Sequence, residues 1–209
     1  MTEATLLRIQ IVTPVGRLSY PHLFSPQTND QGEERFKTAI FFADGVSLAA
    51  MQQAAMDVGV SAFGTDVADL FRSKKVRWPF RSDADDVKER GYPEGSTFVN
   101  MSAKQRPGVV DAAVQDVLDV GEAYAGRDAI ISATAYSYDV SGNKGVTFGL
   151  NHVQLLGHND RLDGRKDASE VFQRQDEVLA NLDAFEGDDG DGSELPCSTD
   201  DDISDLVGK

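Results

Sequence analysis

Apolar and polar residues alternate along several short segments of the chain, which is the pattern of β-strands with one buried face. This alternation predicts strands at residues 5–13, 35–43, 96–103, 128–140 and 146–156. The last two are joined by a glycine-containing turn at 141–145 and form the clearest predicted hairpin. Residues 17–24 are also apolar, but Pro21 lies among them, so this segment is predicted as an edge strand or an irregular loop.

Helical spacing occurs between the second and third of these strands. Four apolar residues recur at helical intervals: Leu48, Met51, Ala55 and Val58. Ser47 is the predicted N-cap of this helix, and a second helical piece covers residues 66–72. Residues 78–95 are polar, charged and interrupted by two prolines, so they are predicted as one long loop. About five strands with one inserted helix predict a mainly β domain, an OB-fold-like five-stranded barrel, although a β-sandwich fits the same pattern.

Charge changes this picture because it is distributed unevenly. The 209 residues carry a formal net charge of -15, which taken alone disfavours binding to nucleic acid. Residues 186–209, however, contain nine acidic side chains and one basic one, whereas residues 72–106 contain nine basic and five acidic ones. We therefore predict a folded domain at 1–175 and a disordered acidic tail at 176–209.

The end of the tail combines an acidic run with apolar residues. The residues that suit a partner-docking peptide are Asp200, Asp201, Asp202, Ile203, Asp205 and Leu206. A tail that serves only solubility has the same composition, and the sequence leaves both interpretations open.

Enzymatic and membrane functions find little support in the sequence. No run of 18 apolar residues could span a membrane, and the single cysteine, Cys197, fits a reducing cytoplasm. Nucleotide-binding, hydrolase and zinc-protease motifs are absent. The one carboxylate cluster outside the tail, at residues 83–86, fits a solvated loop better than a metal nuclease site. We therefore expect a binding protein without a metal or other cofactor.

Bases and aromatic residues are interleaved between residues 72 and 106. The aromatic residues of this stretch are Trp78, Phe80, Tyr92 and Phe98. A single-strand binder needs such a combination, with cations on the phosphates and rings stacked on the bases, but core rings among surface bases give the same pattern. Tyr136 and Tyr138 lie two residues apart on one predicted strand, on a face shared with Ser132 and Thr134, where they could stack on bases or pack under a loop.

Several strings of residues, and their order along the chain, resemble the phage single-stranded DNA-binding proteins that were long grouped as a domain of unknown function. Those proteins are in turn similar to the helix-destabilising proteins of short-tailed coliphages. The most specific strings are Lys104-x-Arg106-Pro107-Gly108-Val109-Val110-Asp111 and Gly142-Asn143-Lys144-Gly145. Supporting strings are Arg17-Leu18-Ser19-Tyr20, Lys37 in its strand, Phe98-Val99-Asn100, and residues 126–138 and 146–154. The resemblance extends from about residue 6 to 172.

The resemblance implies an OB-fold variant that binds single-stranded DNA without strong sequence preference during phage DNA replication or recombination. It also implies action in the cytoplasm of the infected bacterium, and a tail that recruits replication or recombination proteins. The negative charge of the tail predicts in addition that it competes with DNA for the basic groove. Whether the protein is a monomer or a homodimer stays open. A strand-annealing recombination mediator and an acidic scaffolding protein that binds no nucleic acid are the alternatives.

The predicted DNA contacts fall into two groups. The predicted phosphate contacts are Arg17, Lys37, Lys74, Lys75, Arg77, Arg81, Lys104, Arg106 and Lys144. The predicted stacking rings, some of which must belong to the core, are Tyr20, Trp78, Phe80, Tyr92, Phe98, Tyr136 and Tyr138.

Overall fold

The computed structural model describes residues 6–28, 32–140 and 142–162. Contacts divide the chain into two compact units, Met1–Arg165 and Lys166–Lys209, and the described residues all belong to the first. The predicted boundary between residues 175 and 176 and the predicted acidic tail lie outside the described residues.

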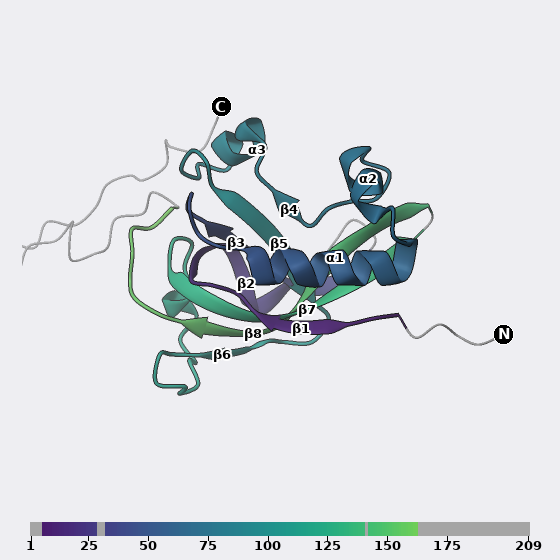
Figure 1. Cartoon of the computed structure of the whole chain (residues 1–209). Coiled ribbons are helices and arrows are strands. Elements are labelled where there is room, and N and C mark those ends of the chain that lie inside the picture. The colour runs from purple at the N-terminus through teal and green to yellow at the C-terminus, as the bar shows by residue number, and fades with distance from the viewer. Residues whose placement is uncertain (1–5, 29–31, 141, 163–209) are drawn as a thin grey trace, which may run out of the picture. The chain divides into compact units, whose positions relative to one another are not determined.

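Five strands are hydrogen-bonded in a closed ring (Figure 1). In order around the ring they are β2 (Gly16–Thr28), β3 (Glu34–Phe42), β5 (Thr97–Ala103), β8 (Asn143–Leu155) and β7 (Asp128–Val140), which pairs again with β2. Neighbours are antiparallel except β5 and β8, which are parallel. The prediction of a mainly β, OB-fold-like arrangement is therefore confirmed, and the strands close on one another instead of forming two separate sheets.

Three short strands extend this ring. They are β1 (Ile9–Val12) beside β7, β4 (Phe80–Arg81) beside β5, and β6 (Gly108–Val110) beside β8. The predicted strand at 5–13 corresponds to β1, whereas β4 and β6 were not predicted, because two or three residues are too few for an alternating pattern. The β7–β8 hairpin is confirmed, with pairing that continues to Val140 and Asn143.

The inserted helix is α1 (Ala49–Phe63), which packs against β7, β8 and β1 through Met51, Ala54, Ala55 and Val58. The predicted Ser47 cap is wrong, because Leu48 occupies the N-cap position and no side chain caps the helix. The shorter helix α2 (Val67–Arg72) follows as predicted. None of the helices that the structure describes is both long enough and apolar enough to cross a membrane.

The predicted long loop at 78–95 is also corrected. It contains β4 and the helix α3 (Ala84–Glu89), which is followed by Tyr92 and Pro93. Asp83 occupies the N-cap position, Asp85 and Asp86 lie in the first turn, and Lys88 lies in the last turn. Carboxylates near a helix N-terminus and a cation near its C-terminus are favourable with the helix dipole, so the acidic cluster marks the start of a helix.

Residues 17–24 belong to β2, which pairs with β3 on both sides of Pro21 but with β7 only at Gly16 and Arg17. The part of β2 that contains Pro21 is therefore paired with one strand only, in agreement with the predicted edge strand. The pairing of β2 with β3 shifts register between Ser19 and His22, so Tyr20 and Pro21 lie in a bulge. A proline has no backbone N–H and is tolerated inside a sheet at such a bulge. This bulge accommodates Pro21 and leaves β2 paired with β3 both before and after it.

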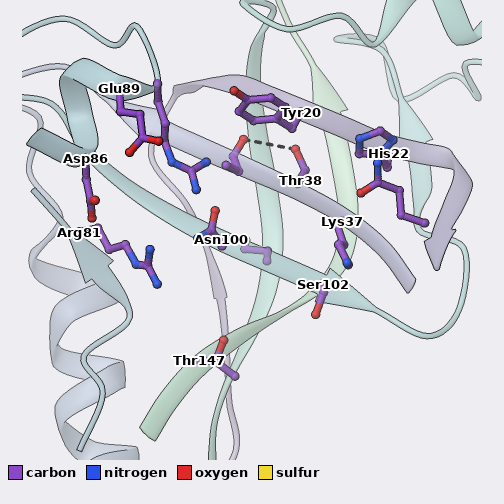
Figure 2. Close-up of a pocket in the computed structure, with 14 residues that line it drawn as sticks. Tyr20, His22, Lys37, Thr38, Arg81, Asp86, Glu89, Asn100, Ser102 and Thr147 are labelled. Atoms are coloured by element: carbon purple, nitrogen blue, oxygen red, sulfur yellow. Dashed lines mark hydrogen bonds between the residues drawn. The ribbon is translucent and has the colours of Figure 1, made fainter. Parts of the chain in front are cut away.

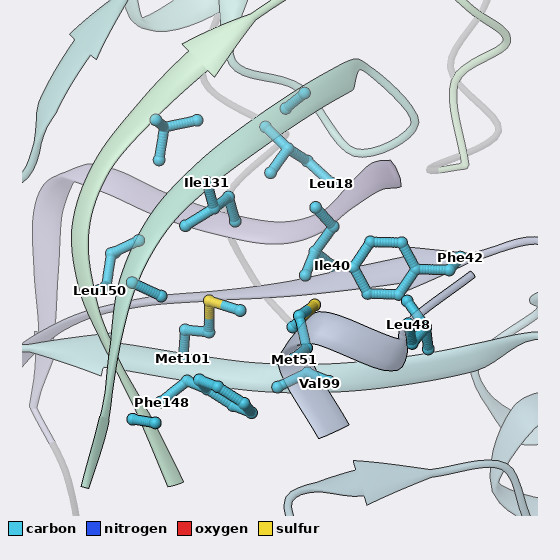
Figure 3. Packing of buried hydrophobic residues seen from close by; sticks show 14 of the residues in the cluster. Leu18, Ile40, Phe42, Leu48, Met51, Val99, Met101, Ile131, Phe148 and Leu150 are labelled. Atoms are coloured by element: carbon cyan, nitrogen blue, oxygen red, sulfur yellow. The ribbon is translucent and has the colours of Figure 1, made fainter. Parts of the chain in front are cut away.

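Apolar side chains fill the interior of the ring, as Figure 3 shows for Leu18, Ile40, Met51, Ile131 and Phe148. The predicted inward face of β7 is confirmed, since Ile131, Ala133 and Ala135 are fully buried. A second, smaller cluster joins the outside of the ring to the α3 region and consists of Phe41, Val87, Tyr92 and Phe98, with Leu162 packed against it.

Candidate nucleic-acid interface

The outer face of β2, β3 and β5 is hollowed into a groove with a volume of about 750 Å³ (Figure 2). Side chains from β4, α3 and β8 complete its walls. The lining residues labelled in Figure 2 are Tyr20, His22, Lys37, Thr38, Arg81, Asp86, Glu89, Asn100, Ser102 and Thr147. β3 and β5 correspond to the second and third strands of the ring, and OB-folds bind oligonucleotides on the face of these two strands.

Tyr20 is presented to this groove by the bulge in β2. Its backbone has a φ of 47°, in the left-handed region that non-glycine residues seldom adopt. The strand therefore turns locally at Tyr20, and 57% of the residue's surface is exposed. Bulges commonly redirect a side chain in this way next to functional sites. The bulge thus converts what would be a strand position into an accessible aromatic surface.

Arg90, at the end of α3, lies against Tyr20. Its guanidinium carbon is 5.7 Å from the centroid of the Tyr20 ring and 4.6 Å from that of Phe98. Cation–π contacts of this kind are worth about 0.5–1 kcal/mol at exposed sites. Arg90 was counted in the basic stretch of the sequence but was not predicted as a contact, because its position depends on the unpredicted helix α3.

Positive charge in the groove comes from the strands as well as from Arg90. Lys37 of β3 and Arg81 of β4 line the groove, and neither side chain makes a hydrogen bond or ion pair within the part of the chain that the structure describes. Asp86 and Glu89 lie on the α3 side. An anionic chain is therefore favoured along the strands and disfavoured near the acidic residues of α3.

Other groove residues were missed as contacts by the sequence prediction: His22, Gln27, Asn100, Ser102 and Thr147. Asn100 and Ser102 alternate with buried residues in a strand that was predicted, so their outward orientation could have been inferred. His22, Gln27 and Thr147 gave no comparable signal, because their placement depends on the bulges of β2 and on the pairing of distant strands.

Four predicted phosphate contacts lie outside the groove, on the end of the β7–β8 hairpin and on the segment that leads to Arg77, which pairs with it. They are Lys74, Lys75, Arg77 and Lys144. The Arg77 backbone N–H donates to the Lys144 carbonyl at 2.9 Å, and the Val146 N–H donates to the Arg77 carbonyl at 3.1 Å. The Lys144 ammonium also pairs with Asp139 at 3.0 Å. The structure thus places Arg77 beside Lys144, and all four bases are exposed.

Arg17 of β2, another predicted phosphate contact, makes its contacts within the protein. Arg17 donates hydrogen bonds from its guanidinium to the backbone carbonyls of Gly126, at 2.9 Å, and Asp160. These bonds join β2 to the segments that precede β7 and follow β8. The Arg17 guanidinium is therefore engaged in holding the fold together, which argues against the predicted phosphate contact.

Two of the predicted stacking rings must also be corrected. Tyr92 is 5% exposed and Phe98 is fully buried. Both rings belong to the second cluster, where the centroid of the Tyr92 ring lies 4.5 Å from that of Phe41 and 5.4 Å from that of Phe98. A ring without an exposed face cannot stack on a base, so both belong to the core. Trp78 and Phe80 are half-buried, pack against each other at 5.2 Å and do not line the groove.

Tyr136 and Tyr138 lie on the outer face of β7, as predicted, and both are half-buried. Each ring covers a glycine of β8. A Cβ atom at Gly145 would lie 2.6 Å from the Tyr138 hydroxyl, and one at Gly149 would lie 3.1 Å from Cε1 of Tyr136. The two tyrosines therefore fill space left by glycines and leave part of each ring exposed.

Lys104 and Arg106 border a second cavity, with a volume of about 600 Å³, on the far side of β5 from β3. Its other polar lining residues are Gln10, Gln105, Thr134, Asn151 and His152. The Arg106 guanidinium carbon lies 5.1 Å from the centroid of the Phe24 ring. Nearby, a hydrogen bond and the charge of Arg35, together with the charge of Lys104, lower the pKa of Glu33.

Comparison with protein families identifies one match. The sequence model of a family described as the single-stranded DNA-binding protein of Enterobacter phage Enc34 matches residues 9–181. A comparison with curated proteins gives no significant match.

Solved structures with a similar fold include proteins of two bacteriophages. The single-stranded DNA-binding protein of bacteriophage Enc34 superposes with a TM-score of 0.50 and 18% identity over 78% of this chain and 90% of that one. The same protein in complex with single-stranded DNA gives a TM-score of 0.51 and 18% identity over 73% and 86% of the two chains. The gp2.5 protein of bacteriophage T7 gives a TM-score of 0.55 and 14% identity over 79% and 98%. These structures support the fold assignment.

Proposed function

The chain belongs to the family of the single-stranded DNA-binding protein of Enterobacter phage Enc34, and on this basis we propose that it binds single-stranded DNA in the groove of β2, β3 and β5. The observation that carries the proposal is that the exposed Tyr20 lines the same groove as Lys37 and Arg81, whose side chains make no hydrogen bond or ion pair among the described residues. A ring that stacks on any base, combined with cations that contact phosphates, binds a single strand without reading its sequence. No catalytic step is required.

The placement of the charged residues around the groove supports this mode of binding. Lys37 and Arg81 are carried by strands, whereas Asp86 and Glu89 are carried by α3. Phosphates are therefore expected to follow the strands, and the bases to turn towards Tyr20 and the α3 wall. Carboxylates near the bases do not repel them as they would repel phosphates, and they can accept hydrogen bonds from amino groups.

The acidic tail adds a second role to the proposal, competition with DNA, and this part rests on the sequence alone. Residues 186–209 carry nine acidic side chains and one basic one and lie outside the described residues. Such a segment can compete with DNA for a cationic groove, and DNA that displaces it leaves it available for replication or recombination proteins. We propose that the protein acts in this way in the cytoplasm of the infected host.

Fluorescence anisotropy with labelled oligonucleotides tests the proposed function. We expect binding of a single-stranded oligothymidylate at low salt, weaker binding of a duplex of equal length, and an affinity that falls steeply as salt is raised. The absence of any anisotropy change with the single strand at low salt would show that the proposed function is wrong.

A further inference from the structure

The groove and the second cavity lie on one continuous row of paired residues around the outside of the ring. Residues paired across neighbouring strands point to the same face of a sheet. The pairings from β2 to β1 connect, in order, His22, Lys37, Ser102, Gly149, Thr134 and Gln10. The first three line the groove, and the last two line the second cavity. Gly149 is therefore the one residue of this row between the two depressions.

Gly149 leaves room for the Tyr136 ring at the crossing between them. Its φ does not lie in the left-handed region, so the backbone conformation does not require a glycine. A side chain at this position would point outwards between Ser102 and Thr134, and its Cβ would approach the ring of Tyr136 to 3.1 Å. The absence of a side chain thus lets the Tyr136 ring lie over Gly149, so a strand that crosses here passes over the exposed part of that ring.

The second cavity has the composition expected of a site for an anionic, hydrogen-bonding chain. Lys104 and Arg106 supply positive charge, and no carboxylate is among its lining residues. Asn151 and Thr134, which are hydrogen-bonded to each other at 2.9 Å, supply amide and hydroxyl groups at its edge. In contrast to the first groove, none of the lining residues is acidic, and the carboxylate of Glu33 lies on the Lys104 side.

We propose that single-stranded DNA continues from the groove across Gly149 into the second cavity, and so follows the ring from β2 to β1. This inference rests on the proposed function. Strands in a sheet are about 4.8 Å apart, so the six-strand row is about 24 Å long, against about 10 Å for the three strands of the groove. A short oligonucleotide is held by the groove alone, whereas a longer one also engages Lys104 and Arg106.

Binding of oligothymidylates of graded length tests the proposal in the full-length protein. The series covers about 4 to about 16 nucleotides, the range found for OB-folds. We expect the double variant Lys104→Gln, Arg106→Gln to bind the longest oligonucleotide at least tenfold more weakly at about 50 mM salt, with a salt slope shallower by about 0.7 for each lost phosphate contact. The shortest oligonucleotide should lose less than twofold.

Matched variants keep the interpretation clear. The double variant Arg72→Gln, Lys88→Gln removes the same charge from exposed residues outside both cavities and should change affinity less than twofold at every length. Gly149→Ser, which alters no charge, should weaken binding of long oligonucleotides only. A loss that is equal at all lengths, or no loss at any length, overturns the proposed path. Failure of the unmodified protein to bind any oligonucleotide instead overturns the proposed function.

Discussion

Replacement of Tyr20 by alanine should weaken DNA binding while leaving the fold intact. The residue is 57% exposed, so little apolar surface is lost from the interior. Its φ of 47° is unfavourable for tyrosine and alanine alike, so the substitution neither relieves nor adds backbone strain. We therefore expect the free energy of unfolding to change by less than about 0.5 kcal/mol, as is usual for a surface substitution.

The effect on binding follows from two contacts of the ring. Stacking of one base on an aromatic side chain is worth about 1–3 kcal/mol, and we take about 2 kcal/mol. A base on Tyr20 displaces the Arg90 guanidinium, whose carbon is 5.7 Å from the ring centroid, and an exposed cation–π contact is worth about 0.5–1 kcal/mol. The net loss is about 1–1.5 kcal/mol, which corresponds to an increase in Kd of about five- to twelvefold.

The measurement is fluorescence anisotropy with a labelled oligothymidylate, combined with thermal unfolding of each variant. Tyr20→Phe is the matched control, because it retains the ring and loses only the hydroxyl, and its Kd should stay within twofold of the unsubstituted protein. A Kd for Tyr20→Ala within twofold of the unsubstituted protein, in a folded sample, would refute the assignment of Tyr20 as a stacking residue.

Three further predictions concern charge, burial and the tail. Lys37→Gln and Arg81→Gln should each make the plot of log Kd against log salt concentration shallower by about 0.7, whereas Lys88→Gln on the exposed side of α3 should leave the slope unchanged; equal slopes for all three would place the phosphates elsewhere. Phe98→Ala should lower the free energy of unfolding by about 3–5 kcal/mol in chemical denaturation, because the ring is fully buried, and a loss below about 1 kcal/mol would contradict its assignment to the core. Deletion of residues 186–209 should tighten binding of short oligonucleotides at low salt and have little effect at high salt, where charges are screened; unchanged or weaker binding at low salt would rule out competition by the tail.

Much of the fold could be predicted from the sequence, because it depends on local alternation. Strand β7 shows this well, since Ile131, Ala133 and Ala135 alternate with outward residues over its whole length. Pro21 left an edge strand and a loop as alternatives, because the bulge that accommodates it depends on pairing with a strand elsewhere in the chain. The helix α3 was missed for a different reason: Asp83 and the acidic residues after it fit an N-terminal helix turn, but six residues show no clear periodicity.

The candidate site was predictable in residue type but not in position. Tyr20, Lys37 and Arg81 were predicted and lie together in the groove. Phe98 was indistinguishable from Tyr20 in the sequence, yet tertiary packing buries one ring and exposes the other. Arg90 became part of the site only through the placement of α3. Burial and proximity of this kind arise from contacts between distant segments, which a single sequence does not show.

The central claim is that the outer face of β2, β3 and β5 binds single-stranded DNA. Two-dimensional ¹⁵N–¹H correlation spectra recorded during titration with an oligothymidylate test it most directly, because backbone amide shifts report which residues a ligand approaches. We predict that the largest shifts occur around Tyr20 and His22 of β2, Lys37 of β3, Asn100 and Ser102 of β5, and the end of α3. Large shifts confined to the hairpin patch around Arg77 and Lys144, with the groove unaffected, would contradict the claim.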